Sequence, residues 1–349
     1  MNITTVDKNL AVKTSFEEPD IKFYDIKENT FCLFGLSIHD DYFRRIPESL
    51  AKQTNEGVLY LHTNTSGGKL RFITDSPYVA ISAKMPDIRL FPHMPQSGIS
   101  GFDLYVGDKF FAPFMPPAEL EGGYDSINHF KTSELREITI HFPLYNNVSD
   151  LYIGLKEGSA FLPPKDFRNN KTVLFYGSSI TQGGCVSRPG LSFPAIAATR
   201  LDFNLINLGF SGSAKGEECM AEYIGDLHPD IFVLDYDHNA PTLEHLNATH
   251  EKFFKIFREK NPDTPVIMIS SPDFVHFEKL NAIERREVIR TTYNNAVLSG
   301  DKNVYFIDGE TLWGEDWDLC TMDKSHPNDL GHYRMAMNLI PVLEKILNK

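Results

Sequence analysis

The chain has 349 residues, of which 42% are hydrophobic and 23% are charged, and its formal net charge at pH 7 is −13. The composition is that of an ordinary globular protein, and the length favours two domains over one. Because nucleic acid and anionic membranes both bind cationic surfaces, the acidic balance argues against either as a main partner.

The cysteines and the N-terminal residues indicate a cytoplasmic protein. Cys32, Cys185, Cys219 and Cys320 are widely spaced and form no C-x-x-C pair, so reduced thiols are expected instead of a disulfide framework. The first residues contain no basic segment followed by an apolar run, and we therefore expect no signal peptide. No apolar stretch approaches the roughly 20 residues of a membrane span.

The first half of the chain alternates short β-prone runs with turn residues. Several of these runs alternate apolar and polar residues, which is the pattern of half-buried strands, and their spacing predicts an antiparallel sandwich. The runs cover residues 31–36, 57–63, 69–74, 78–84, 101–106 and 137–142. Two prolines and a polar run at 161–170 predict a joint. We therefore expect a β-sandwich domain at 1–165 and a second domain at 166–349.

After this joint the hydrophobic period changes. Apolar strand candidates at 172–176, 204–208, 231–236, 265–270 and 303–307 alternate with helical stretches at 192–201, 216–227, 242–260, 279–298 and 329–347. Near-continuous apolar strands between helices indicate a parallel sheet covered on both faces. Functional loops should then lie at the carboxyl ends of the strands. Pro341 is expected to kink the last helix.

Two segments of this second half carry the residue types of nucleophilic catalysis. The run VLFYGSSIT at 173–181 delivers Ser179 from a predicted strand into a turn, and Asp323 and His326 stand three positions apart before the last helix. A serine needs a base to become a nucleophile, and the base needs a group that orients it. Because position 181 is Thr, the turn is not the G-x-S-x-G elbow of α/β-hydrolases. The alternative is structural: a turn serine, and a carboxylate favoured by a helix N-terminus.

These segments resemble blocks of the SGNH (GDSL-like) hydrolases, which are named for Ser, Gly, Asn and His. GSSIT at 177–181 is similar to the first block, although Ser178 stands where the family has Asp. NLGFSG at 207–212 is similar to the second block, and DKSHP at 323–327 to the fourth. The resemblance implies a flavodoxin-like, three-layer α/β/α domain.

The third block, at 233–240, resembles the family only in part. Asn239 is in place, but Asp235 stands where Gly is usual, and Ala240 where Asp often follows. This departure keeps open the alternative that the domain is an inactive hydrolase that only binds carbohydrate.

The resemblance implies a role for each motif residue. Ser179 would attack an ester carbonyl, His326 would accept its proton, and Asp323 would orient His326. The backbone N–H groups of Ser179 and Gly212 and the side-chain amide of Asn239 would form the oxyanion hole. No metal and no organic cofactor is implied.

The segment GFDLY at 101–105 resembles the G-x-D-L-Y signature of a jelly-roll-like β-sandwich that precedes SGNH domains in one group of esterases. This two-domain resemblance implies removal of small acyl groups, above all acetyl, from a carbohydrate such as xylan- or mannan-derived oligosaccharides. The rival within the same class is a general acylhydrolase or thioesterase that acts on lipid-like or small esters. The partner in every enzymatic case is a small-molecule or oligosaccharide ester.

Three further residues are candidates for substrate binding. Trp313 and Trp317 are the only tryptophans, and an indole face could stack on a sugar, with core packing as the alternative. His93 lies in a proline-flanked loop at 91–95 that could reach the site across the domain boundary. Cys185, six residues after Ser179, is interpreted as inert.

Overall fold

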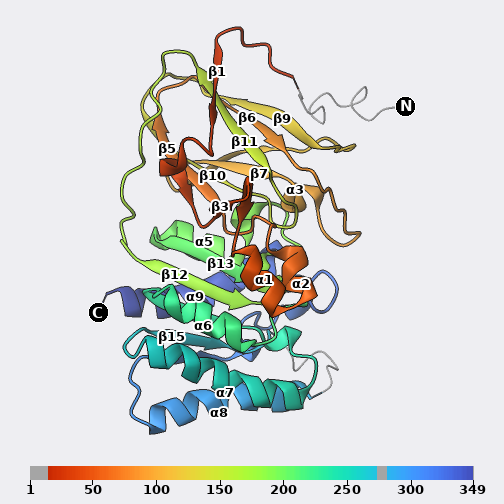
Figure 1. The fold of residues 1–349 in the computed structure, drawn as a ribbon, viewed down its shortest axis with the longest axis vertical. Helices are drawn as coiled ribbons and strands as arrows, with labels where there is room; N and C mark the ends of the chain where they lie inside the picture. Colours follow the sequence, from red (N-terminus) through yellow and green to blue (C-terminus); the bar gives the residue numbers. More distant parts are fainter. Residues whose placement is uncertain (1–14, 273–280, 349) are drawn as a thin grey trace.

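A computed structural model describes residues 15–272 and 281–348 of the chain. Antiparallel sheets occupy one end of the elongated molecule and a helix-covered parallel sheet the other (Figure 1). Within the two described ranges, no helix combines the length and the apolar character that a membrane span requires.

The N-terminal half forms two antiparallel sheets around one core. The first has the order β1-β11-β6-β9, with the bounds Ile21–Asp25, Asp150–Lys156, Tyr78–Lys84 and Gly123–His129. The second has the order β2-β5-β10-β7-β8, with the bounds Leu33–Phe34, Lys69–Thr74, Arg136–His141, Phe102–Val106 and Lys109–Phe114. Buried residues of both sheets, such as Phe72 and Ile153, belong to the same apolar cluster. The predicted sandwich is therefore confirmed.

Two of the predicted strands are wrong. Residues 31–36 contain only the short strand β2, because a 3-10 turn at Thr30–Cys32 precedes it. Residues 57–63 lie mostly in a helix, α2 (Glu56–Leu61), which follows α1 (Glu48–Thr54). Asn55 caps α2 by accepting a hydrogen bond from the Val58 amide at 2.9 Å. Val58 and Leu61 are three positions apart, so on a helix they face the same core.

The C-terminal half contains the predicted parallel sheet, with the order β13-β12-β14-β15-β16. The strands are β12 (Thr172–Gly177), β13 (Asn204–Gly209), β14 (Ile231–Asp235), β15 (Val266–Ile269) and β16 (Val304–Ile307). Numbered along the chain, this order is 2-1-3-4-5, which is that of flavodoxin-like folds. The fold class expected from the sequence is thus confirmed.

Helices cover both faces of this sheet. The helices α5 (Phe193–Leu201) and α9 (Asp329–Leu347) pack together on one face. The other face carries α6 (Glu218–Asp226), α7 (Leu243–Lys260) and α8 (Ala282–Leu298). The helix predicted at 279–298 begins at two residues outside the described ranges. Pro341 lies inside α9 without ending it.

The two halves share more than a linker. Ala51 of α1 and Val58 of α2 are buried in the same cluster as Leu174 of β12 and Ala221 of α6. Hydrogen bonds add to this contact: the Ser66 hydroxyl donates to the Gln182 carbonyl at 2.6 Å. The N-terminal half thus packs directly against the turn that follows β12. The boundary between 165 and 166 stays a prediction.

Candidate active site

Ser179 begins a one-turn helix, α4 (Ser179–Gln182), directly after β12. The side chain of Ser178 caps this helix by accepting a hydrogen bond from the Ile180 amide at 3.2 Å. A Cβ on Gly177 would overlap the Thr181 side chain, so only glycine allows this tight turn. The turn leaves the Ser179 residue only 5% exposed at the carboxyl edge of the sheet.

Asp323, His326 and Ser179 form a continuous chain of hydrogen bonds. Ser179 Oγ lies 2.9 Å from His326 Nε2, and His326 Nδ1 lies 2.8 Å from Asp323 Oδ2. Burial raises the pKa of Asp323, but hydrogen bonds from the backbone and side chain of His326 outweigh it and hold the pKa below the usual value. The ionised carboxylate therefore accepts a hydrogen bond from the Nδ1–H group, and Nε2 is left to accept a proton from the serine.

The Gly212 and Asn239 groups expected at an oxyanion hole contact each other. The Gly212 N–H donates to Asn239 Oδ1 at 3.1 Å, and Asn239 Nδ2 donates to the Phe210 carbonyl at 2.8 Å. These two bonds fix the orientation of the Asn239 amide. Since an amide nitrogen carries two hydrogens, the contact with Phe210 leaves one for a substrate oxygen. Gly212 has φ +65°, which explains the glycine by backbone conformation.

The irregular third block also fixes the site. Asp235, at the end of β14, accepts a hydrogen bond from Thr181 Oγ1 at 2.7 Å and thereby holds α4. Burial raises the pKa of Asp235 to about 8, so this carboxyl group is mostly neutral at pH 7. His238 Nε2 lies 3.3 Å from Ser325 Oγ and so contacts the loop that carries His326.

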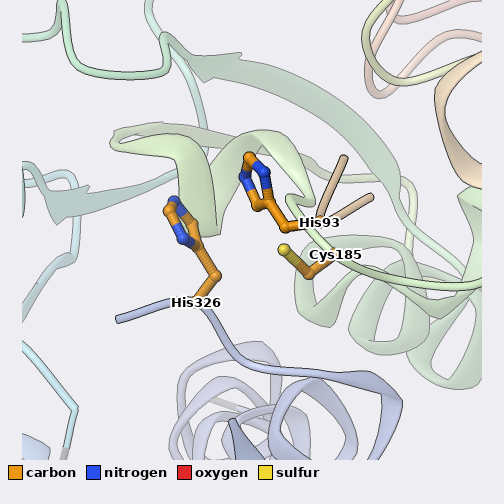
Figure 2. Close-up of side chains that lie close together, drawn as sticks. All are labelled: His93, Cys185 and His326. Carbon is orange, nitrogen blue, oxygen red and sulfur yellow. The ribbon is translucent and has the colours of Figure 1, made fainter. Parts of the chain in front are cut away.

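Two aromatic side chains of the N-terminal half, Tyr145 and His93, lie next to the catalytic residues. The Tyr145 hydroxyl donates to the Ser179 carbonyl at 3.2 Å, a contact that the sequence motifs do not signal. The ring centroids of His93 and His326 lie 5.6 Å apart. The predicted reach of the 91–95 loop across the boundary thus agrees with the position of His93, whereas substrate contact stays a prediction. Cys185 lies beside both histidines (Figure 2).

The G-x-D-L-Y segment holds the residues that follow α4. Asp103 is fully buried in β7 and accepts hydrogen bonds from Arg188 Nη1 at 2.8 Å and from the Gly190 amide at 2.9 Å. Arg188 also contacts the Tyr105 hydroxyl at 2.6 Å. Burial raises the pKa of Asp103 to about 6, although Arg188 acts in the opposite direction. The Asp and Tyr of the signature therefore join the two halves next to the nucleophile turn.

The sugar platform predicted for Trp313 is wrong. Trp313 is only 1% exposed and packs in the core between the parallel sheet and the helices α5 and α9, so it offers no face to a ligand. Trp317 is half-buried and packs against the same core. Its substrate role stays a prediction.

Comparisons with known proteins match both halves of the chain. Residues 170–344 match the GDSL-like lipase/acylhydrolase family, and residues 21–161 match a family described as the N-terminus of SGNH-hydrolase-type esterases. A solved structure described as a GDSL-like lipase from Bacteroides ovatus is 29% identical, with a TM-score of 0.85. The matched region covers 94% of this chain and 98% of the chain of that structure. No curated protein matches the sequence.

Two more distant structures share the fold over nearly the whole length. A salicylyl-acyltransferase from a tetracycline biosynthetic pathway is 21% identical with a TM-score of 0.73, and covers 95% of this chain and 96% of its own. An acetyl xylan esterase from the rumen bacterium Butyrivibrio proteoclasticus is 14% identical with a TM-score of 0.57, and covers 94% and 99% respectively. At these identities the likeness concerns the fold alone.

Proposed function

The chain belongs to the GDSL-like lipase/acylhydrolase family, whose SGNH members are ester hydrolases, and from that premise we propose a serine esterase that removes small acyl groups, above all acetyl, from carbohydrate. The observation that carries the proposal is the pair of hydrogen bonds, 2.9 and 2.8 Å long, that joins Ser179 to His326 and His326 to Asp323. This is the arrangement of a nucleophile, its base and the group that orients the base.

The reaction follows from these contacts. Ser179 Oγ attacks the ester carbonyl while His326 Nε2 takes the hydroxyl proton. The tetrahedral intermediate collapses to an acyl-enzyme on Ser179, and His326 returns the proton to the departing alcohol. Water then attacks the acyl-enzyme with His326 again as the base, and acetate leaves. Asp323 keeps the imidazole in the required tautomer and stabilises its protonated form.

The oxyanion of the intermediate needs hydrogen-bond donors that already surround it. We assign this role to the backbone N–H groups of Ser179 and Gly212 and to the Asn239 amide. Because the Gly212 N–H donates to Asn239 Oδ1 before substrate binds, the oxyanion has to share or replace that bond. The second hydrogen of Asn239 Nδ2 is the donor that needs no rearrangement.

Crowding and polarity at the site support a small acyl group on a polar alcohol. Ser179 is nearly buried, the Tyr145 hydroxyl contacts its backbone carbonyl, and the His93 ring lies beside that of His326. A two-carbon acetyl group needs less room there than a long acyl chain. The neighbouring polar groups of His238 and Ser325 suit a hydroxylated substrate better than a lipid. The name of the acetyl xylan esterase points to the same substrate class.

The deciding experiment measures acetate release from acetylated xylan and mannan oligosaccharides. Hydrolysis of 4-nitrophenyl acetate, butyrate and octanoate would be measured beside it, for the wild type, Ser179→Ala and Ser178→Ala. The proposal expects acetate release from the sugars and a steep fall in the hydrolysis rate for acyl chains longer than acetyl. Ser179→Ala should lose both acetate release and ester hydrolysis, and Ser178→Ala should keep them. The control Ser178→Ala removes a helix cap, worth about 1 kcal/mol, and should stay active.

Other outcomes would contradict the proposal in distinguishable ways. Rates that rise with chain length and ignore the sugars would indicate a general acylhydrolase. Acetyl transfer to a second alcohol at the expense of free acetate would indicate an acyltransferase. Sugar binding without reaction of Ser179 with a fluorophosphonate would indicate a carbohydrate-binding protein.

A further inference from the structure

Three side chains from separate segments meet beside the nucleophile: His93 of the N-terminal half, Cys185 after α4, and His326. One nitrogen of each imidazole and the Cys185 sulfur all lie within 4.8 Å of one another. Figure 2 shows that the three side chains lie close together. We propose that they form a binding site for a thiophilic divalent cation, Zn²⁺ above all, and that the bound ion reversibly inhibits the enzyme.

The ligand set suits zinc in both chemistry and size. Imidazole nitrogen and thiolate sulfur are its preferred donors, at about 2.0–2.1 Å and 2.3 Å respectively. Tetrahedral geometry at these lengths puts neighbouring donors about 3.4–3.6 Å apart. The three donors therefore have to approach one another by at most about 1.4 Å, which small rotations of the three side chains can supply. Mg²⁺ prefers oxygen ligands and fits this donor set poorly.

The surroundings of the cluster already resemble those of a metal ligand. Asp323 accepts a hydrogen bond from the Nδ1–H group of His326 at 2.8 Å, which fixes the ring and leaves Nε2 free of hydrogen. Metal-bound histidines are commonly held by a carboxylate in this way. The Cys185 segment is also fixed, because the Gly184 amide donates to the Ser179 carbonyl at 2.8 Å and the Gly184 carbonyl lies 3.0 Å from the buried His332 Nε2.

Inhibition follows because the metal ion and the Ser179 hydroxyl would both use the same nitrogen, His326 Nε2. Since Asp323 engages Nδ1 of His326, the nitrogen available to a metal ion is Nε2, which lies 2.9 Å from Ser179 Oγ and has a single lone pair. A metal ion that binds this lone pair prevents it from accepting the serine proton, so the ion and the catalytic hydrogen bond exclude each other. The thiol of Cys185 releases its proton to solvent as the sulfur binds the ion, and the fourth position of the ion is open to water. The inhibition rests on the proposed esterase function, whereas the binding does not.

Metal binding can be tested without any activity measurement. Zn²⁺ titration calorimetry and the thiolate-to-Co²⁺ absorption band would be compared for the wild type, His93→Asn, Cys185→Ser and the distant control Cys219→Ser. Since removal of a partner that only orients a ligand costs 10–100-fold in affinity, loss of a direct ligand should cost at least about tenfold. We expect this loss in His93→Asn and Cys185→Ser, with the Co²⁺ band absent from Cys185→Ser and unchanged in Cys219→Ser.

The activity arm uses 4-nitrophenyl acetate with Zn²⁺, Mg²⁺ or EDTA. Zn²⁺ should inhibit the wild type, EDTA should restore it, and Mg²⁺ should have little effect. Cys185→Ser should keep its basal rate and need at least about tenfold more Zn²⁺ for the same inhibition. Equal Zn²⁺ affinity in wild type and Cys185→Ser, or Co²⁺ binding without a thiolate band, would overturn the proposal. Metal binding by a wild type without esterase activity would leave the site intact and contradict the proposed function.

Discussion

Asp323 fixes its own loop as well as the imidazole of His326. One carboxylate oxygen accepts hydrogen bonds from the backbone amides of Ser325 and His326, at 3.0 and 2.7 Å. The other accepts a hydrogen bond from the imidazole N–H of His326. The catalytic and the structural interpretation of this residue are therefore compatible. The short spacing of the two residues makes the arrangement possible, because an aspartate three positions earlier reaches both the backbone and the ring.

Changing Asp323 to Asn should separate these two roles. The amide oxygen can still accept hydrogen bonds, but an amide stabilises neither the required tautomer nor the imidazolium. We expect kcat to fall by up to about 10⁴-fold, the loss typical for a triad carboxylate, with little change in thermal unfolding. Steady-state kinetics and calorimetry would test this. A kcat near that of the wild type would mean that the backbone alone orients His326.

Asn239 can be tested with a pair of substitutions. Asn239→Ala removes both the donor to a substrate oxygen and the acceptor of the Gly212 N–H, whereas Asn239→Asp keeps the acceptor and brings a negative charge. Removal of one oxyanion-hole donor usually costs about 10²–10³ in turnover. We expect that loss in Asn239→Ala and a larger one in Asn239→Asp, measured as kcat on 4-nitrophenyl acetate. If Asn239→Asp were as active as the wild type, Asn239 would not be a donor to the oxyanion.

The segment that follows α4 is held from several elements at once. Ser187 accepts a hydrogen bond from Ser97 of α3 (Gln96–Ile99) at 2.6 Å and donates its hydroxyl to Asp329 of α9 at 2.6 Å. Arg188 and Gly190 bind Asp103 of β7. The nucleophile turn is therefore positioned by the sandwich as well as by its own sheet.

The buried carboxyl of Asp103 should make this contact depend on pH. Its pKa in the folded protein is about 6, because burial raises it, against about 3.9 in the unfolded chain. Between these values the unfolded chain releases the proton first, so the free energy of unfolding falls as pH rises and is constant above about pH 6. Relative to Asp103→Asn, the wild type should lose roughly 2 kcal/mol between pH 4 and pH 7.

Urea unfolding of the two proteins at several pH values would measure this difference, since titrations common to both cancel. A difference that grows with pH would contradict the prediction. It would mean that the Arg188 guanidinium lowers the pKa of Asp103 more than burial raises it.

The elements of the second half could be predicted because each has a strong and local signal. Apolar strands alternate with long amphipathic helices, and the motif residues follow the strands directly. The sequence does not predict the helix α2, since its run of apolar residues also fits a strand, and only the burial of Val58 and Leu61 in the apolar cluster against the parallel sheet decides between them. Trp313 was misinterpreted for a similar reason, because burial depends on elements distant in sequence.

In the candidate site, too, the sequence motifs identify residues but not the contacts between segments distant in sequence. Ser179, Asp323, His326 and Asn239 are found by their motifs, and the structure brings them to the same edge of the sheet. Tyr145 belongs to no motif, so only the docking of the two halves reveals its position. Cys185 lies near the nucleophile turn in sequence, but its approach to the two histidines is evident only in the structure.

At the scale of the whole molecule, residues of the N-terminal half complete one core of the second half, although the sandwich also has an apolar cluster of its own. The helices α1 and α2 of the N-terminal half bury Ala51, Val58 and Leu61 in the apolar cluster that covers one face of the parallel sheet. Removing this cover would expose part of that cluster to water.

A fragment of residues 166–349 should therefore fold poorly although it contains every SGNH block. We expect low soluble yield, binding of a dye specific for exposed apolar surface, and esterase activity far below that of the full chain. Size-exclusion chromatography and dye fluorescence would show this, with the full chain as the control. A monodisperse and fully active fragment would mean that the two helices and Tyr145 are dispensable.

The residues of the candidate site are synthesised in an order that places the nucleophile before its base. His93 and Tyr145 are synthesised first, the turn with Ser179 follows, and Asp323 and His326 come last. A nascent chain that has reached only β16 (Val304–Ile307) already has its nucleophile, but the serine has no base. If the proposed roles hold, the enzyme stays inert throughout most of its synthesis and becomes active only when the loop before α9 folds onto a sheet that is already complete.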